Sequence, residues 1–231
     1  MGKNQSIKLS ERLKNLNITE LITSDLLRAI ETSKEIIKYH SNIKYSENKL
    51  LRERDLGDFE GIDYRIYFSK FKEENNSLTR NLQTANGSES LNQVFQRAIT
   101  ILNILIKEYI NQNIFIEIKN ENIELNKDIS YEELCEDFKQ GKLSLNIKED
   151  DIKLCNIVLI SHCVLVKEFL NIFLIFLEKK ILRWIEFSNT SIYIVKLFCG
   201  KCKGKCEKIN EHNINDLIFS IDTINDFSHL N

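Results

Sequence analysis

Apolar residues in the first half of the chain recur at helical spacing. Leucines three or four positions apart in residues 9–16 predict that the chain begins inside an amphipathic helix. A second helix is expected along residues 26–37, with Ser24 or Asp25 as its cap. A third, longer helix is predicted from about Ser88 to Ile110. Its core face is expected to contain Leu91, Val94, Phe95, Ala98, Leu102, Leu105 and Tyr109.

Short apolar runs between the helices predict strands. The pair Leu21-Ile22 and the run at residues 156–160 each precede polar residues and a new helix. The second of these helices is expected from the apolar run at residues 164–177. Alternating strands and helices indicate an α/β domain with a mainly parallel sheet. In such sheets, ligands lie at the carboxyl ends of the strands.

The second half of the chain has a less regular pattern. Residues 112–152 are polar, charged and rich in asparagine, which indicates an insertion, with a short helix near residues 131–138. Partial alternation predicts a strand at residues 191–198, paired with another at residues 217–221 across a loop rich in glycine, lysine and cysteine. Because no linker or internal repeat interrupts the pattern, residues 1–231 are expected to form a single domain.

Composition limits the classes of function that fit the chain. The formal net charge is −2 at pH 7, so nothing indicates a nucleic-acid partner, and a phosphate site would need a local cluster of basic groups. The apolar run at residues 164–177 carries two charged residues and is too short to span a bilayer, so no membrane partner is expected. Six cysteines without an apolar leader segment favour a reducing, cytoplasmic setting.

Three short stretches carry the candidate chemistry. Residues 22–32 read Ile-Thr-Ser-Asp-Leu-Leu-Arg-Ala-Ile-Glu-Thr, residues 51–61 read Leu-Arg-Glu-Arg-Asp-Leu-Gly-Asp-Phe-Glu-Gly, and residues 158–162 read Val-Leu-Ile-Ser-His. Their order and spacing resemble the histidine phosphatase superfamily of phosphoglycerate-mutase-like proteins. Gly-Ser-Glu-Ser at residues 87–90 and Asn-Thr-Ser-Ile at residues 189–192 resemble further elements of the same family.

This resemblance implies a fold and a set of site residues. The fold would be a three-layer α/β sandwich, with a mainly parallel central sheet flanked by helices. The resemblance implies that Arg28 and Asn189 bind phosphate and that His162 stabilises the phosphoryl group in transfer. It also implies that Glu53 protonates the leaving oxygen and then activates water. The expected partner is a small phosphorylated metabolite, and the chemistry requires no cofactor or metal.

The residue types suit these roles, and each also has an ordinary structural interpretation. The planar fork of an arginine can hold two phosphate oxygens at once. A histidine that opens a helix can donate to phosphate beside the free backbone N–H groups of the first turn. The structural interpretations are a surface Arg28 paired with Glu31, a Glu53 within a solvated charge run, and a satisfied core histidine at position 162.

The residue after His162 departs from the family pattern. The family usually has glycine there, and this chain has Cys163. A side chain at that point is expected to narrow the pocket or tilt the backbone donors. Because a helix N-terminus lowers the pKa of a thiol, Cys163 is also a candidate redox-sensitive cysteine.

The expected nucleophile is missing from the sequence. Family members open with a strand that ends Arg-His-Gly-Glu, and its histidine attacks phosphorus. The chain contains four histidines, none of them in an Arg-His-Gly sequence: His40, His162, His212 and His229. Residues 5–16 resemble the helix that follows that strand, so the first strand of the fold is expected to be missing. An N-terminal truncation is favoured over a degenerate pseudo-enzyme, because removing a central strand would open the core.

Several members of the family remain possible relatives in function. Residues 62–86 are short and lack the Trp-Arg-Arg-Ser element of the mutases, which favours a phosphatase. The insertion and the ending Asn-Asp-Phe-Ser-His-Leu-Asn resemble the TIGAR branch, whose members hydrolyse fructose-2,6-bisphosphate. The alternatives are a catalytically inactive phosphate-ligand or protein-binding relic, a phosphoglycerate mutase, and a phosphoprotein phosphatase.

A cysteine-rich loop is a separate candidate for metal binding. Cys199, Cys202 and Cys206 have the spacing of partial zinc ligands, and His212 follows nearby. The two glycines and four lysines between residues 200 and 208 are equally typical of a plain hairpin loop.

Overall fold

A three-stranded parallel sheet forms the centre of the computed structural model. The structure describes residues 2–63, 65–66, 80–81, 83–109, 128–129, 136, 140, 155–176, 181–182, 188–199 and 217–230. Strand β1 (Glu20–Thr23) lies between β2 (Lys44–Glu47) and β4 (Ile157–Ile160). Thr23 pairs with Glu47 on one side and with Ile160 on the other, so the carboxyl ends of the three strands are level.

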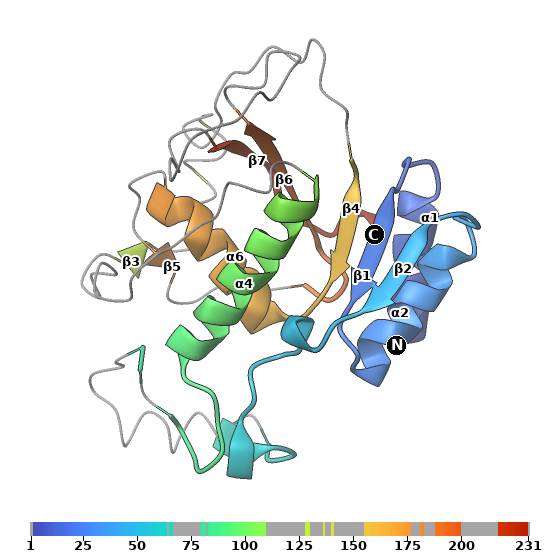
Figure 1. Cartoon of the computed structure of the whole chain (residues 1–231). Helices are drawn as coiled ribbons and strands as arrows, with labels where there is room; N and C mark the ends of the chain where they lie inside the picture. Colours follow the sequence, from blue (N-terminus) through green and yellow to red (C-terminus); the bar gives the residue numbers. More distant parts are fainter. Residues whose placement is uncertain are drawn as a thin grey trace.

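Helices cover both faces of this sheet (Figure 1). Helices α1 (Gly2–Leu13) and α2 (Leu27–Ile37) pack on one face, and α4 (Leu91–Tyr109) and α6 (Cys163–Phe176) pack on the other. Alternate strand residues point to opposite faces of the sheet. Leu21 therefore packs in the core with α1 and α2, and Ile22 packs in the core with α4 and α6. The three-layer α/β fold and the parallel sheet expected from the sequence are confirmed.

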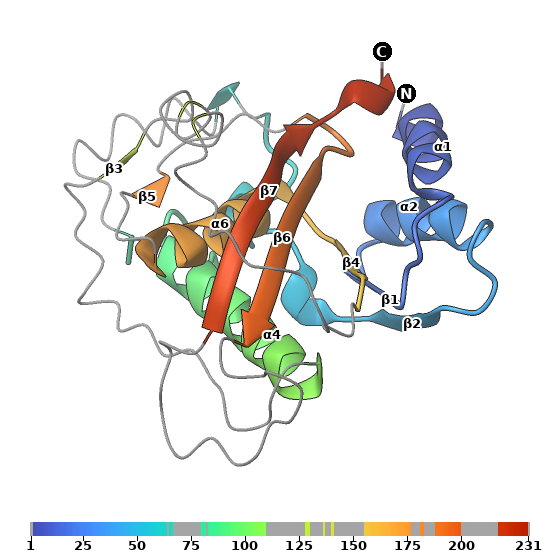
Figure 2. The ribbon, with the colours of Figure 1, turned by 90° about the horizontal axis from the view of Figure 1, so that it is seen from above.

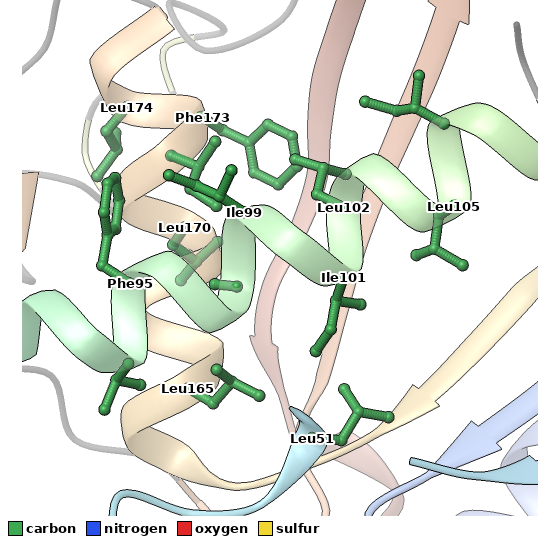
Figure 3. Close-up of a cluster of buried hydrophobic side chains, with 14 of the residues drawn as sticks. Leu51, Phe95, Ile99, Ile101, Leu102, Leu105, Leu165, Leu170, Phe173 and Leu174 are labelled. Atoms are coloured by element: carbon green, nitrogen blue, oxygen red, sulfur yellow. The ribbon is translucent and has the colours of Figure 1, made fainter. Parts of the chain in front are cut away.

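The larger core lies between α4 and α6. Figure 3 shows Phe95 of α4 beside Leu174 of α6, and Phe173 of α6 between two apolar side chains of α4. Both Phe95 and Leu174 are fully buried. Leu51, from the short turn η1 (Lys49–Leu51) after β2, is also fully buried in this core. Its burial anchors the loop that leads to Glu53.

Two charged residues of the otherwise apolar helix α6, Lys167 and Glu168, are buried in the core. Glu168 is fully buried and forms ion pairs with Arg80 at 2.5 Å and with Lys167 at 3.1 Å. Asn92 of α4 accepts a further hydrogen bond from the Arg80 guanidinium at 2.9 Å. Burying a charge is costly unless it is paired, and these partners satisfy the Glu168 carboxylate.

A β-hairpin packs against α4 and α6, as Figure 2 shows. Strand β6 (Ile192–Cys199) pairs in antiparallel register with β7 (Leu217–Asp226), which confirms the predicted pair and extends its second strand to Asp226. The short turn η5 (Ser228–Leu230) follows β7 and lies beside α1, where Lys8 donates to the carbonyl of Leu230 at 2.9 Å. The two ends of the chain are therefore adjacent (Figure 2). The two-residue strands β3 (Asp128–Ile129) and β5 (Ile181–Leu182) form a separate parallel pair.

Three sequence expectations about helix ends need correction. Helix α1 ends at Leu13, and Leu16 is 47% exposed, because the chain has already turned toward β1. Helix α4 begins at Leu91 and not near Ser88. Its start is a capping box, in which the Ser90 hydroxyl accepts from the Gln93 N–H at 3.2 Å and the Gln93 side chain accepts from the Ser90 N–H at 2.7 Å. Neither Ser24 nor Asp25 caps α2, whose N-cap position is Leu26 without a side-chain hydrogen bond.

Several sequence expectations fall outside the described residues. They include most of the insertion at 112–152 with its expected helix, and the loop that holds Cys202 and Cys206. Among the helices of the described part, none combines the length and the apolar character needed to cross a bilayer.

Candidate active site

The carboxyl end of the sheet brings the three sequence motifs together. Backbone N–H groups of Ser24 and Asn48 donate to the strand-end carbonyls of Ile160 and Thr23, each at 2.8 Å. The hydroxyl of Ser161 donates to the carbonyl of Leu51 at 2.8 Å. These bonds tie together the segments that follow β1, β2 and β4, which is where a parallel sheet places a ligand.

Arg28 and His162 are in direct contact although 134 positions separate them. The guanidinium Nε of Arg28 donates to Nδ1 of His162 at 3.2 Å. An arginine can only donate, so Nδ1 carries the lone pair and the proton of the neutral ring is on Nε2. That nitrogen lies 3.0 Å from the hydroxyl of the buried Ser24, to which it donates. The geometry fixes one tautomer of His162 and orients its ring.

The surroundings of His162 favour the neutral imidazole. Partial burial lowers the pKa of His162, and the positive charges of Arg28 and Arg97 lower it further, to about 4. The ring is therefore neutral at pH 7 and can donate one hydrogen bond through Nε2. The cationic partner for an anion at this edge would be Arg28, whose side chain is exposed.

Glu53 lies beside His162 because its carboxylate binds the first turn of α6. Its Oε1 accepts from the backbone N–H of Val164 at 3.2 Å and from that of Arg54 at 2.8 Å. Its Oε2 accepts from the thiol of Cys163 at 3.4 Å. A helix N-terminus has unpaired N–H donors and a positive dipole end, and both favour a carboxylate there. Glu53 is thus held by the residues that directly follow His162.

The expectation of a reactive thiol at Cys163 is wrong. Although the residue as a whole is exposed, its sulfur rests against Glu53. Loss of solvent around the sulfur and the negative charge of Glu53 raise the pKa of Cys163 to about 12, in spite of the helix N-terminus. The thiol therefore stays protonated and serves Glu53 as a hydrogen-bond donor.

A bidentate ion pair links two of the site's loops. Nε and Nη2 of Arg52 donate to the two carboxylate oxygens of Asp25, each at 2.6 Å. The hydrogen bond from Arg52 is the main reason that the pKa of Asp25 lies below its ordinary value. Asp25 follows Ser24, and Arg52 precedes Glu53, so the pair fastens the Arg28 motif to the Glu53 motif. The sequence pointed to neither role, since Asp25 was expected to cap a helix and Arg52 lies in an ordinary charge run.

The loop that contains Glu53 ends at Gly57, which is the first residue of the turn η2 (Gly57–Phe59). Its φ is +56°, a conformation that L side chains rarely adopt. A Cβ at this position would meet the carbonyl oxygen of Asn86 at 2.2 Å and the nitrogen of Ser88 at 2.6 Å. The loop thus rests directly on the backbone of the segment before α4.

Asn189 lies in an exposed turn before β6. The next residue, Thr190, has a φ of 58°, and its hydroxyl lies 3.1 Å from Nε2 of His229 near the end of the chain. Among the described residues, no hydrogen bond joins the Asn189 side chain to Arg28, Glu53 or His162, so its phosphate-binding role stays a prediction. The described part of the chain also contains no cluster of three potential metal ligands. The suggested ligands Cys202 and Cys206 lie outside it.

A profile of the histidine phosphatase superfamily (branch 1) matches residues 1–118, about half of the chain and the part that supplies Arg28 and Glu53. The chain belongs to the histidine phosphatase superfamily. A curated relative, phosphoglycerate mutase-like protein 4 of Arabidopsis thaliana, is 32% identical over 106 residues. The match covers 44% of this chain and 46% of that relative, so the chain spans about half the length of the curated protein it matches.

Solved structures of the superfamily share the fold at low identity. A mycobacterial glucosyl-3-phosphoglycerate phosphatase in complex with inorganic phosphate is 16% identical, with a TM-score of 0.60 over 98% of this chain and 86% of that one. A phosphoglycerate mutase from Bacillus anthracis is also 16% identical, with a TM-score of 0.58 over 99% of this chain and 81% of that one. At such identities the likeness shows the fold alone.

The pKa of His162 is directly measurable. In a pH titration followed by NMR, the His162 ring should titrate near pH 4, well below 6.5. Arg28→Gln should raise that midpoint because it removes one of the positive charges that lower it. Arg12→Gln, which removes an exposed arginine paired with Asp226, should leave it unchanged. A wild-type midpoint near 6.5 would contradict the geometry.

The same shift makes the stability of the protein depend on pH. The unfolded chain binds this proton at a higher pH than the folded chain does, so the stabilisation is complete above about pH 6.5 and is lost as the pH falls toward 4. After allowance for solvent screening of a partly exposed group, we expect a loss of about 1 kcal/mol. His162→Gln should remove this part of the pH dependence in urea unfolding.

Substitution of Gly57 tests the fit of the Glu53 loop. Gly57→Ala combines a left-handed backbone with a clash against backbone atoms, so we expect it to lower the free energy of unfolding by about 2–4 kcal/mol. Gly61→Ala is the matched control, because Gly61 has a φ of +78° but open space around its Cβ position, and should cost about 1 kcal/mol. Urea unfolding of both variants measures the difference, and equal losses would show that the loop does not rest on residues 86–88.

Proposed function

We propose that the protein hydrolyses phosphomonoesters through a phosphohistidine intermediate. One observation carries the proposal, namely that Arg28, Glu53 and His162 converge at the carboxyl end of the sheet from three distant parts of the chain. Arg28 would hold the phosphoryl oxygens, and the Nε2 proton of His162 would turn from Ser24 to the same group. Negative charge on these oxygens in the transition state is what such donors stabilise.

Glu53 would manage the protons of both steps. In the first, a histidine attacks phosphorus, the bond to the leaving oxygen breaks, and Glu53 gives that oxygen its proton. In the second, Glu53 takes a proton from water, the water oxygen attacks the phosphohistidine, and inorganic phosphate leaves with the histidine restored. The closeness of Glu53 to His162, through Cys163 and Val164, supports this assignment.

The attacking histidine would come from a strand outside these 231 residues. Within the described residues, β4 pairs only with β1, and its four apolar residues, Ile-Val-Leu-Ile, are only half-buried. Such a strand is typical of the interior of a parallel sheet, where both faces and both edges are covered. A further strand along β4 that ends in Arg-His-Gly-Glu would place its histidine beside His162.

The substrate is proposed to be a small cytoplasmic sugar phosphate, of which fructose-2,6-bisphosphate is the leading example. The short segment at residues 62–86 supports a phosphatase over a mutase, and the insertion at residues 112–152 and the ending Asn-Asp-Phe-Ser-His-Leu-Asn support the TIGAR-like branch. The names of the structural relatives support small phosphorylated substrates in general: one is a phosphatase of glucosyl-3-phosphoglycerate, and another is a phosphoserine phosphatase from Entamoeba histolytica in complex with phosphoserine.

A second candidate is a phosphate-binding or protein-binding relic without turnover. The absence of an Arg-His-Gly sequence from the chain favours it, as does the contact between Arg28 and His162, which occupies both residues. The mutase named among the relatives keeps phosphoglycerate mutase as a third candidate, and a phosphoprotein phosphatase would use the same groups.

Binding of orthovanadate, a phosphate analogue, is the first test. Isothermal titration should show binding to the chain, and Arg28→Gln and His162→Asn should each weaken it about 10-fold or more, since each removes a donor to a charged group. Arg12→Gln is the control and should bind normally. The chain alone should release no inorganic phosphate from phosphomonoesters, and vanadate-sensitive turnover by it would contradict the proposed source of the nucleophile.

An extended chain then separates the candidate functions. Addition of an N-terminal apolar strand ending in Arg-His-Gly-Glu should give turnover, and Glu53→Gln and His162→Ala should each reduce it about 100-fold or more. The same extension with alanine in place of its histidine is the control. Phosphate release from fructose-2,6-bisphosphate supports the proposal, isomerisation of 3-phosphoglycerate supports the mutase, and preference for a phosphoserine peptide supports the phosphoprotein phosphatase. Vanadate binding without any turnover supports the relic.

A further inference from the structure

A single arginine on α4 holds the backbone of the loop that carries Glu53. Nη1 of Arg97 donates to the carbonyls of Leu50 and Arg52, at 2.7 and 2.9 Å, and Nη2 donates to the carbonyl of Glu53 itself at 3.3 Å. Nε and Nη2 also donate to the two carboxylate oxygens of Glu89, at 2.8 and 2.6 Å. One guanidinium thus makes five hydrogen bonds, three of them to consecutive parts of one loop.

Glu89 holds Arg97 in place and binds the next residues of the same loop. Its carboxylate accepts from the N–H of Asp55 at 3.0 Å, and its own N–H donates to the Asp55 carbonyl at 2.9 Å. The buried Arg54 donates through Nε to the carbonyl of Glu89 at 2.7 Å. Residues 50–55 are therefore fastened along their length to the segment that leads into α4.

The pattern of bonds distinguishes positioning from a simple ion pair. An ion pair with Glu89 alone would account for only two of the five hydrogen bonds of Arg97. It would give the guanidinium no reason to face the loop. Instead its fork reaches the carbonyls of Leu50, Arg52 and Glu53, and its side chain is only 16% exposed. The planar, fixed geometry of a guanidinium suits several carbonyls at once, which an ammonium group cannot match.

The backbone and the carboxylate of Glu53 are thus held from opposite sides. Arg97 of α4 binds the backbone carbonyl, while the first turn of α6 binds the carboxylate through Val164. A loop without Arg97 would keep its other anchors, such as the buried Leu51 and the pair of Arg52 with Asp25, but would lose the hydrogen bond to the backbone carbonyl of Glu53. The distance between Glu53 and His162 would then vary with the loop.

We propose that Arg97, oriented by Glu89, is the positioning residue that sets Glu53 against the first turn of α6 next to His162. The proposal rests on the proposed function only in giving this placement a purpose, the delivery of a proton by Glu53. Arg97 itself touches neither substrate nor reacting atoms in this arrangement, and it acts through the Glu53 loop.

The amide of Val164 reports whether Glu53 is in place. In the wild-type chain this amide donates to Oε1 of Glu53, so its hydrogen exchange with solvent should be slow, and we call this protection the Val164 response. Glu53→Ala should abolish the protection. Arg97→Gln should abolish it as well, while the amides of β1 and the core of α4 keep their wild-type protection. Arg12→Gln, a surface arginine, is the control and should leave the Val164 response intact.

Arg97→Lys separates positioning from charge. A lysine keeps the positive charge near Glu89 but cannot reach three carbonyls and a carboxylate together. We therefore expect the Val164 response to be lost in Arg97→Lys too, whereas a role limited to charge would be rescued. A folded Arg97→Gln or Arg97→Lys protein with the full Val164 response would overturn the proposal.

Glu89→Gln covers the case in which the Arg97 variants do not fold. It removes the charged anchor and leaves Arg97 present, so the Val164 response should shrink, and a full response would again overturn the proposal. None of these signals requires phosphate or turnover. A chain that fails to bind vanadate but loses the Val164 response in Arg97→Gln would support the positioning role and contradict only the proposed function.

Discussion

Four parallel residue pairs between β1 and β4 determine where Arg28 and His162 lie. They align Thr23 with Ile160, so the segments that contain Ser24 and His162 leave the sheet side by side. The contact of Arg28 with His162 follows from this register, since Arg28 lies in the first turn of the helix after β1. A shift of the register by one residue would reverse the faces of β4, so that the side chains now packed on one core would face the other.

Around this register, the site is built by contacts that run between loops. Arg52, in the loop after β2, pairs with Asp25, in the loop after β1. Arg97 fastens the loop after β2 to α4. The loop after β4 leads into α6, where the N–H of Val164 and the thiol of Cys163 donate to the Glu53 carboxylate. The buried Leu51 also holds the loop after β2 in place, because its side chain packs in the core between α4 and α6 (Figure 3). The positions of Arg28, Glu53 and His162 therefore depend on one another.

The long helices could be predicted because their apolar periodicity is strong. The parallel sheet and the late strand pair were predicted from short apolar runs and partial alternation. Arg28, Glu53 and His162 emerged from motif order, and the structure brings them together. Arg97 could not be found in the same way. It is one polar residue inside an amphipathic helix, and its role depends on carbonyls more than 40 positions away.

The thiol of Cys163 shows the limit of local rules. Its place at a helix N-terminus predicts a lowered pKa, but the neighbouring Glu53 carboxylate and the loss of solvent outweigh the helix and raise it. The predicted end of α1 was also wrong, since Leu16 continues the helical spacing although the chain has already turned toward β1. For Cys163, a contact distant in sequence decides the outcome.

The central claim is that Arg28, His162 and Glu53 form one anion-binding site at the carboxyl end of the sheet. A crystal structure of the chain with bound tungstate, located by its anomalous signal, tests this most directly. We expect the anion within hydrogen-bond distance of the Arg28 guanidinium and of Nε2 of His162, with the Glu53 carboxyl group beside it. Tungstate bound elsewhere, with the contact between Arg28 and His162 unchanged and no anion at that edge, would contradict the account.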